Sequence, residues 1–135
     1  MPAPTSPVTT PVRFEHHTTA LGIGEDTPRL SWVTTSAPTG WSQAGYELHS
    51  GDEVVTVDSA ESVLVAWPFA PLASGEAREV SVRVRDAAGT WSDWSTPAAV
   101  EAGLLVASAW TASWVGPDAE APSGLLRGTF TLPEG

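Results

Sequence analysis

The stretch Glu79-Val80-Ser81-Val82-Arg83-Val84-Arg85 carries the clearest structural pattern in this sequence. Apolar and polar residues alternate along it with a period of two, which is the period of a β-strand that has one buried face. We therefore expect a strand from Arg78 to Asp86. Its three valines should lie in a hydrophobic core, and its serine and both arginines should lie on the opposite face.

Six further runs with β character accompany this strand, at intervals of roughly ten residues, with Gly, Pro, Ser and Asp between them. They cover residues 12–17, 29–35, 44–50, 54–58, 62–66 and 96–101. Trp32 and Tyr46 alternate with polar neighbours, so we expect them to face the core together with the valines. About seven strands in about ninety residues predict an all-β protein, an antiparallel sandwich of the fibronectin type III or immunoglobulin-like kind.

The sequence divides into four predicted segments. Residues 1–11 are rich in Pro, Thr and Ala and are expected to be flexible, because they have nothing to bury. The sandwich should fill residues 12–103, and residues 104–124 read as an extension and a linker rich in Pro, Gly, Ser and Ala. Residues 125–135 have the pattern of one more strand without a partner, which predicts the first strand of a truncated second β-domain.

Composition excludes several classes of function. The 135 residues carry a formal net charge of −10, with no lysine and no cysteine. Binding to nucleic acid or to an anionic membrane needs clustered basic residues, so neither is expected as a partner. A disulfide framework or a thiolate zinc site is impossible without cysteine. The N-terminus does not resemble a signal peptide, so we expect a cytoplasmic protein, or a secreted one if an export signal lies outside this sequence.

No residue pattern predicts a catalytic, cofactor or metal site. His16 and His17 are neighbours on a predicted strand and would point to opposite faces, which prevents them from chelating one ion. Glu25, Asp26 and Asp93 are scattered over turn-like segments, where acidic side chains are common. A glycosidase holds two carboxyl groups about 5 to 10 Å apart across a sugar cleft. Nothing signals such a cleft, so this chain alone is not expected to be an enzyme or to need a cofactor.

The most distinctive motif is Trp91-Ser92-Asp93-Trp94-Ser95, which follows the strand that carries Arg83 and Arg85. Guanidinium groups stack well on indole faces, so the motif predicts an Arg/Trp stack on the outer face of the sheet. Alternatively, the tryptophans could form a binding surface for carbohydrate or protein if their indole faces are open. Arginines that cover these faces would remove the support for this binding hypothesis. The motif is also similar to a box in class I cytokine receptors, but the absence of cysteine counts against that family.

A longer series of segments, in order, resembles the N-terminal region of bacterial α-L-rhamnosidases. The strongest is residues 21–32, Leu-Gly-Ile-Gly-Glu-Asp-Thr-Pro-Arg-Leu-Ser-Trp, which is similar to the family's Leu-Gly followed shortly by Pro-Arg-Leu-Ser-Trp. Further similar segments lie at residues 43–48, 82–86, 92–95, 101–105 and 110–115. The resemblance implies a fibronectin type III-like domain at the start of an inverting glycoside hydrolase that removes terminal α-L-rhamnose. Its acidic catalytic residues would lie in a helical barrel far downstream, and no position here matches them.

Two functions follow from these observations. The first is a structural module that packs against downstream domains of the same polypeptide, and the second is an autonomous domain that binds carbohydrate or protein. Trp110 and Trp114 lie outside the predicted sandwich and favour the first, because exposed apolar side chains usually cover something. Trp91 and Trp94 would favour the second only if their faces are open.

Overall fold

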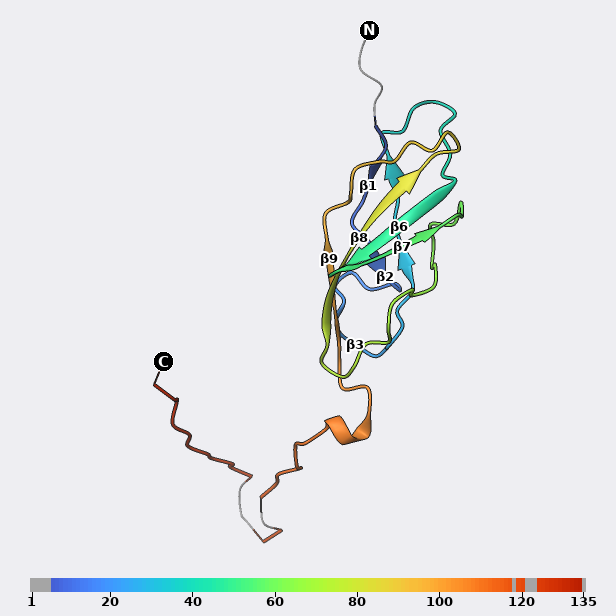
Figure 1. The fold of residues 1–135 in the computed structure, drawn as a ribbon. Coiled ribbons are helices and arrows are strands. Elements are labelled where there is room, and N and C mark those ends of the chain that lie inside the picture. Colours follow the sequence, from blue (N-terminus) through green and yellow to red (C-terminus); the bar gives the residue numbers. More distant parts are fainter. Residues whose placement is uncertain (1–5, 118, 121–123, 135) are drawn as a thin grey trace.

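The computed structural model describes residues 6–117, 119–120 and 124–134. Within this part of the chain, all regular structure is β except for one short 3-10 turn, η1 (Ala107–Ala109). The strands form a narrow sandwich, and the chain leaves one end of it through η1 (Figure 1). Among the described residues there is no helix with the length and apolar character that a membrane crossing requires.

One layer of the sandwich is a five-stranded sheet with the order β3-β9-β8-β6-β7. Its strands are β3 (Leu21–Ile23), β9 (Ala98–Ala102), β8 (Ala77–Arg85), β6 (Gly45–Ser50) and β7 (Glu53–Val57). Neighbouring strands are antiparallel, apart from β3, which runs parallel to β9. The turn between β6 and β7 places Gly51 at a φ of 59°, in the left-handed region that favours glycine.

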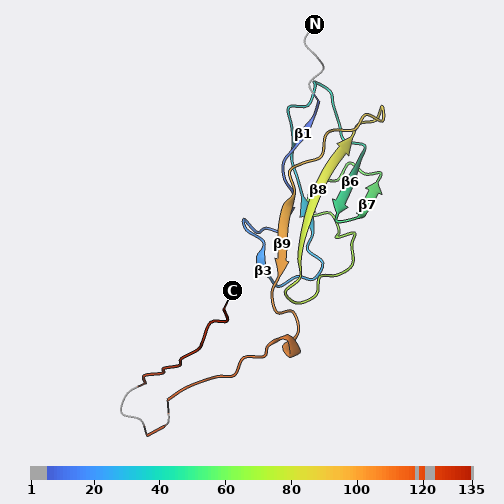
Figure 2. The same ribbon diagram turned by 60° about the vertical axis from the view of Figure 1, so that its left-hand side comes forward.

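The second layer consists of shorter pairs. The pairs are β1 (Val8–Thr9) with β5 (Thr34–Thr35) and β2 (Arg13–Phe14) with β4 (Leu30–Ser31). Residues 62–66, predicted as a strand, contribute only one bridge, between Leu30 and Val65. The reason is local: Leu64 has a φ of 50° and donates its backbone N–H to Ser31 Oγ, so the chain turns away from a regular ladder. Figure 2 shows β3 next to β9, at the edge of the long sheet.

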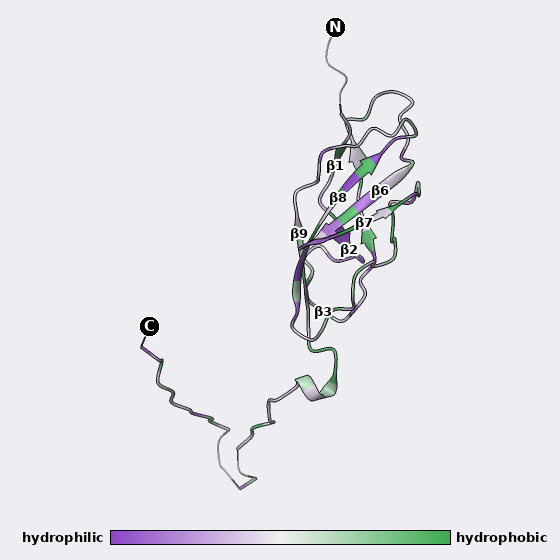
Figure 3. Cartoon of the chain, viewed as in Figure 1, coloured by the Kyte–Doolittle hydropathy of each residue, from purple (hydrophilic) through white to green (hydrophobic). Residues whose placement is uncertain are grey.

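The core lies between the two layers. Val80, Val82 and Val84 on β8 have no exposed surface, as the alternation predicts. Burial of a valine of this kind contributes about 1.5 to 3 kcal/mol. Trp32 and Tyr46 are also buried and meet edge to face with ring centroids 4.8 Å apart. Strands β6 and β8 each contain both hydrophobic and hydrophilic residues, as expected for a sheet with one buried face (Figure 3). The predicted all-β, immunoglobulin-like sandwich is therefore confirmed, with nine short strands over the described residues instead of seven.

Both ends of the chain differ from the expectations. Pro7 and Thr9 are buried and Val8 pairs with Thr35, so the idea that residues 1–11 have nothing to bury is wrong for this part. Residues 1–5 lie outside the described residues, as do residues 118, 121–123 and 135 of the C-terminal part. Residues 125–134 form no strand, because no other described strand lies beside them to pair with. The predicted second domain stays a prediction.

Candidate functional site

The outer face of the long sheet carries a row of paired polar side chains. The strand register places Glu47 on β6 opposite Arg83 on β8 and opposite Thr56 on β7. Arg83 Nε donates to Glu47 Oε2 at 2.5 Å, and the Thr56 hydroxyl donates to Glu47 Oε1 at 3.0 Å. Glu47 is only 9% exposed. A carboxylate at this depth needs such partners, because an unpaired buried charge is strongly destabilising.

The four residues predicted as an Arg/Trp surface lie together on this face. The guanidinium carbon of Arg83 is 4.8 Å from the ring centroid of Trp91 and 4.7 Å from that of Trp94. Arg85 lies 5.5 Å from the Trp91 centroid and also bonds to Asp58. Cations and indoles thus alternate in the order Arg85, Trp91, Arg83 and Trp94, which we call the Arg/Trp stack.

His49 of β6 continues the Arg/Trp stack beyond Trp94, with ring centroids 5.5 Å apart. Each indole is therefore in contact with two cationic or aromatic partners, although Trp94 remains 38% exposed. A sugar ring needs a free aromatic face to stack on. The arrangement removes the main support for a carbohydrate-binding platform at these tryptophans.

The two serines between and after these tryptophans hold the segment against β8. Pairing between β8 and β9 ends at Val80 and Ala98, so the next part of the β8 edge needs other partners. Ser92 and Ser95 donate their backbone N–H groups to the carbonyls of Val84 and Val82, each at 2.8 Å. Their Oγ atoms accept the N–H groups of the same two valines at 3.0 Å. The motif thus provides hydrogen-bond partners for the backbone groups at the edge of β8. The sequence reasoning missed this role despite the regular Ser-x-x-Ser spacing.

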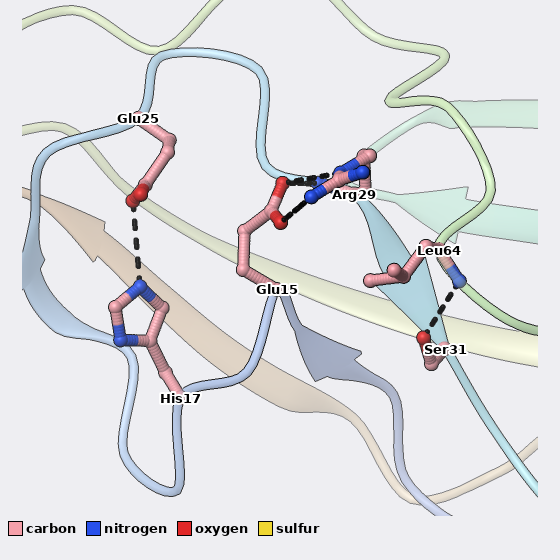
Figure 4. A network of polar contacts seen from close by, with 6 residues as sticks. All are labelled: Glu15, His17, Glu25, Arg29, Ser31 and Leu64. Carbon is pink, nitrogen blue, oxygen red and sulfur yellow. Dashed lines mark hydrogen bonds and ion pairs between the residues drawn. The ribbon is translucent and has the colours of Figure 1, made fainter.

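A second polar network joins β2 to β4 (Figure 4). Arg29 donates from Nε and Nη2 to the Glu15 carboxylate, at 3.0 and 2.6 Å, and its backbone N–H donates to Glu15 Oε1 at 2.8 Å. The Arg29 guanidinium bonds, followed by this backbone bond, lower the pKa of Glu15 to about 2. A carboxyl group that stays ionised at neutral pH cannot donate a proton, so Glu15 is not a general acid. The Glu15–Arg29 ion pair therefore has a structural role: it connects the ends of β2 and β4.

The other candidate residues are dispersed. His16 is exposed, and His17 Nε2 lies 3.4 Å from Glu25 Oε2. Glu25 and Asp26 border a shallow recess beside the Glu15–Arg29 pair, whereas Asp93 borders a different recess beside β1. The structure therefore does not bring these acids together across a cleft. Over the described part of the chain, no group of three or more His, Asp or Glu side chains is placed to hold a metal ion.

The two tryptophans predicted to pack between domains lie beyond the sandwich. Trp110 follows η1 directly and is 59% exposed, and Trp114 is 97% exposed. Neither belongs to the hydrophobic core. Figure 1 shows this segment running away from the strands.

The closed core and the mutually paired polar side chains define a small immunoglobulin-like β-sandwich. The family model described as the Rha78A-like N-terminal immunoglobulin domain matches residues 9–106. This chain belongs to that family, which confirms the resemblance to the N-terminal region of α-L-rhamnosidases.

Solved and curated relatives agree with this assignment. An α-L-rhamnosidase of Streptomyces avermitilis is 36% identical over 129 residues, which cover 85% of this chain and 12% of the relative. The crystal structure of native α-L-rhamnosidase from Aspergillus terreus matches with a TM-score of 0.78 and 38% identity, covering 86% of this chain and 14% of that one. A structure of the Streptomyces avermitilis α-L-rhamnosidase complexed with L-rhamnose matches with a TM-score of 0.75 and 34% identity, covering 83% and 12%. This chain therefore spans about an eighth of the length of these relatives.

Proposed function

We propose that this chain is the N-terminal, non-catalytic sandwich of a longer α-L-rhamnosidase, in which it packs against the domains that follow. The proposal rests on the match to the Streptomyces avermitilis relative. This chain forms a complete sandwich, yet the match covers only 12% of that protein. The longer protein would release terminal α-L-rhamnose from glycosides, with inversion at the sugar carbon. Its catalytic acids would lie outside the residues described above.

The polar side chains of the sandwich support a non-catalytic role. Glu47 is held by Arg83, and Glu15 is held by Arg29 with its pKa lowered to about 2. An inverting glycosidase instead needs one carboxyl group with a raised pKa and a second one across a sugar pocket. Both of these carboxylates are thus held by arginines.

The exposed apolar side chains support a packing role. Leu104, Val106, Trp110 and Trp114 follow one another after β9, and each is more than half exposed. Apolar surface gathered on one segment is unfavourable in water and commonly marks a contact with another protein surface. No specific contact favours the second candidate, an autonomous carbohydrate-binding domain, since Trp91 and Trp94 are already engaged by Arg83.

The proposal is tested with three proteins: this chain, the longer polypeptide that its gene encodes, and that polypeptide without residues 1–106. An aryl α-L-rhamnoside should be cleaved by the second protein and not by this chain. Removal of residues 1–106 should lower the melting temperature of the longer protein. Turnover by the chain alone, or a deletion that changes neither melting nor activity, would contradict the proposal.

A further inference from the structure

The end of the sandwich from which the chain exits is hollowed. A recess there is lined by Gly24, Asp26, Leu72, Ser74, Leu105 and Val106. Leu72 is buried, and Leu105 packs against the core. We call the recess, together with the adjoining Leu104, the exit surface.

Two apolar side chains of the exit surface are exposed although their backbone is well held. Leu104 and Val106 are 55% and 57% exposed. Leu21 on β3, which pairs with Glu101 of β9, is exposed close to where the chain exits. A single exposed apolar residue needs no explanation, but Leu104 and Val106 are both exposed beside a recess that Val106 lines, and such a grouping indicates a contact surface.

Hydrogen bonds fix the backbone that presents these side chains. Gly103 donates its N–H to the carbonyl of Ile23 at 2.8 Å, and Leu105 donates its N–H to Ser74 Oγ at 2.8 Å. A Cβ at Gly103 would lie only 3.0 Å from the carbonyl oxygen of Gly22, so a side chain here would push this close backbone crossing apart by a few tenths of an ångström. A backbone held in this way loses little conformational entropy when the surface binds, so the surface is preorganised at the level of the main chain.

The occupant that fits best is the remainder of the same polypeptide. The relatives are several times longer than this chain, and the family is an N-terminal domain, so most of such a polypeptide would follow the exit point. A domain tethered on the same polypeptide has a raised effective concentration, so it needs a smaller apolar surface than a free partner would. The one carboxylate on the recess, Asp26, would face a basic side chain or an N–H donor.

We propose that the exit surface is the docking surface for the polypeptide that follows Gly135. This contact would set the orientation of the sandwich relative to the next domain. The proposal rests on the proposed function and specifies its interface. The docked element would insert an apolar side chain into the recess beside Leu72 and would cover Leu104 and Val106. Trp110, which closes η1, lies on the path between the two domains and would be covered with them.

The test compares Leu104→Ser and Val106→Ser with the control Val54→Ser, each made in this chain and in the longer polypeptide. Val54 is similarly exposed, at 53%, but lies on β7 at the other edge of the long sheet. In this chain, all three variants should melt within a few degrees of the parent, as is usual for exposed positions. In the longer polypeptide, the parent and the control should show amide exchange at residues 104 and 106 about tenfold slower than in this chain. Leu104→Ser and Val106→Ser should lose that protection.

Each contrary result has a distinct meaning. Equal amide exchange rates at residues 104 and 106 in this chain and in the longer polypeptide would overturn the proposed docking surface. If deletion of residues 1–106 destabilises the longer protein while Leu104→Ser and Val106→Ser behave like the control, the sandwich packs through another face and only this inference fails. Concentration-dependent protection in this chain, together with a dimer in sedimentation, would make a second copy the occupant. A deletion without any effect would remove the proposed function as well.

Discussion

Replacing Arg83 by alanine should destabilise the sandwich more than replacing Arg85, the other arginine of the Arg/Trp stack. The Arg83 guanidinium contacts both Trp91 and Trp94, at 4.8 and 4.7 Å from their centroids, and donates to Glu47. Each cation–π contact is worth about 0.5 to 1 kcal/mol. The substitution therefore removes two stacking contacts and the main partner of a carboxylate that is 9% exposed.

The magnitude follows from these contacts. Two stacking contacts give about 1 to 2 kcal/mol. The charge-assisted bond to Glu47 adds about 1 kcal/mol after allowance for solvent screening, since the Arg83 side chain is 30% exposed. We expect a loss of about 2 to 3 kcal/mol in the free energy of unfolding, which lowers the melting temperature by roughly 10 °C or more.

Two matched variants separate the contributions. Arg85→Ala removes one stacking contact, at 5.5 Å, and an ion pair with Asp58, whose side chain is 83% exposed, so we expect a loss of about 1 kcal/mol or less. Arg83→Lys keeps the charge but loses the planar stack, and it should fall between the two. Urea unfolding followed by tryptophan fluorescence measures all three. Equal stabilities for Arg83→Ala and Arg85→Ala, or an unchanged melting temperature for Arg83→Ala, would refute this reasoning.

Further predictions concern the strand edge, the acid response and ligands. Ser92→Ala and Ser95→Ala should each cost about 1 to 3 kcal/mol in urea unfolding, because each leaves a buried valine N–H without its acceptor. The pKa of Glu15 is lowered from 4.5 to about 2, so its stabilising effect is present above pH 4.5 and is lost as the pH falls toward 2. Acid titration of Glu15→Gln should accordingly show a smaller loss of stability over that window than the parent. Titration with L-rhamnose should leave the tryptophan fluorescence unchanged, and a saturable shift would revive the binding alternative.

The sequence predicts well those features that depend on local alternation. Val80, Val82 and Val84 are buried, and Arg83 and Arg85 meet Trp91, because a period of two assigns each side chain to a face without knowledge of the partner strand. The same logic correctly placed Trp32 and Tyr46 in the core.

Features that depend on pairing between distant segments could not be predicted. Glu47 meets Arg83 only because β6 and β8 adopt one particular register, which alternation does not specify. The strands β1 and β3 are too short to show a period, and β3 gains its place from hydrogen bonds such as that from Glu101 to Ala20. The Glu15–Arg29 ion pair also joins residues that are fourteen positions apart in the sequence, so local alternation does not reveal it.

The central claim is that this sandwich begins a longer α-L-rhamnosidase. The most direct test is the nucleotide sequence of the gene beyond the codon for Gly135. We predict an open reading frame that continues for several times the length of this chain and encodes a helical barrel with acidic residues. A stop codon directly after Gly135, or a continuation without such a barrel, would contradict it.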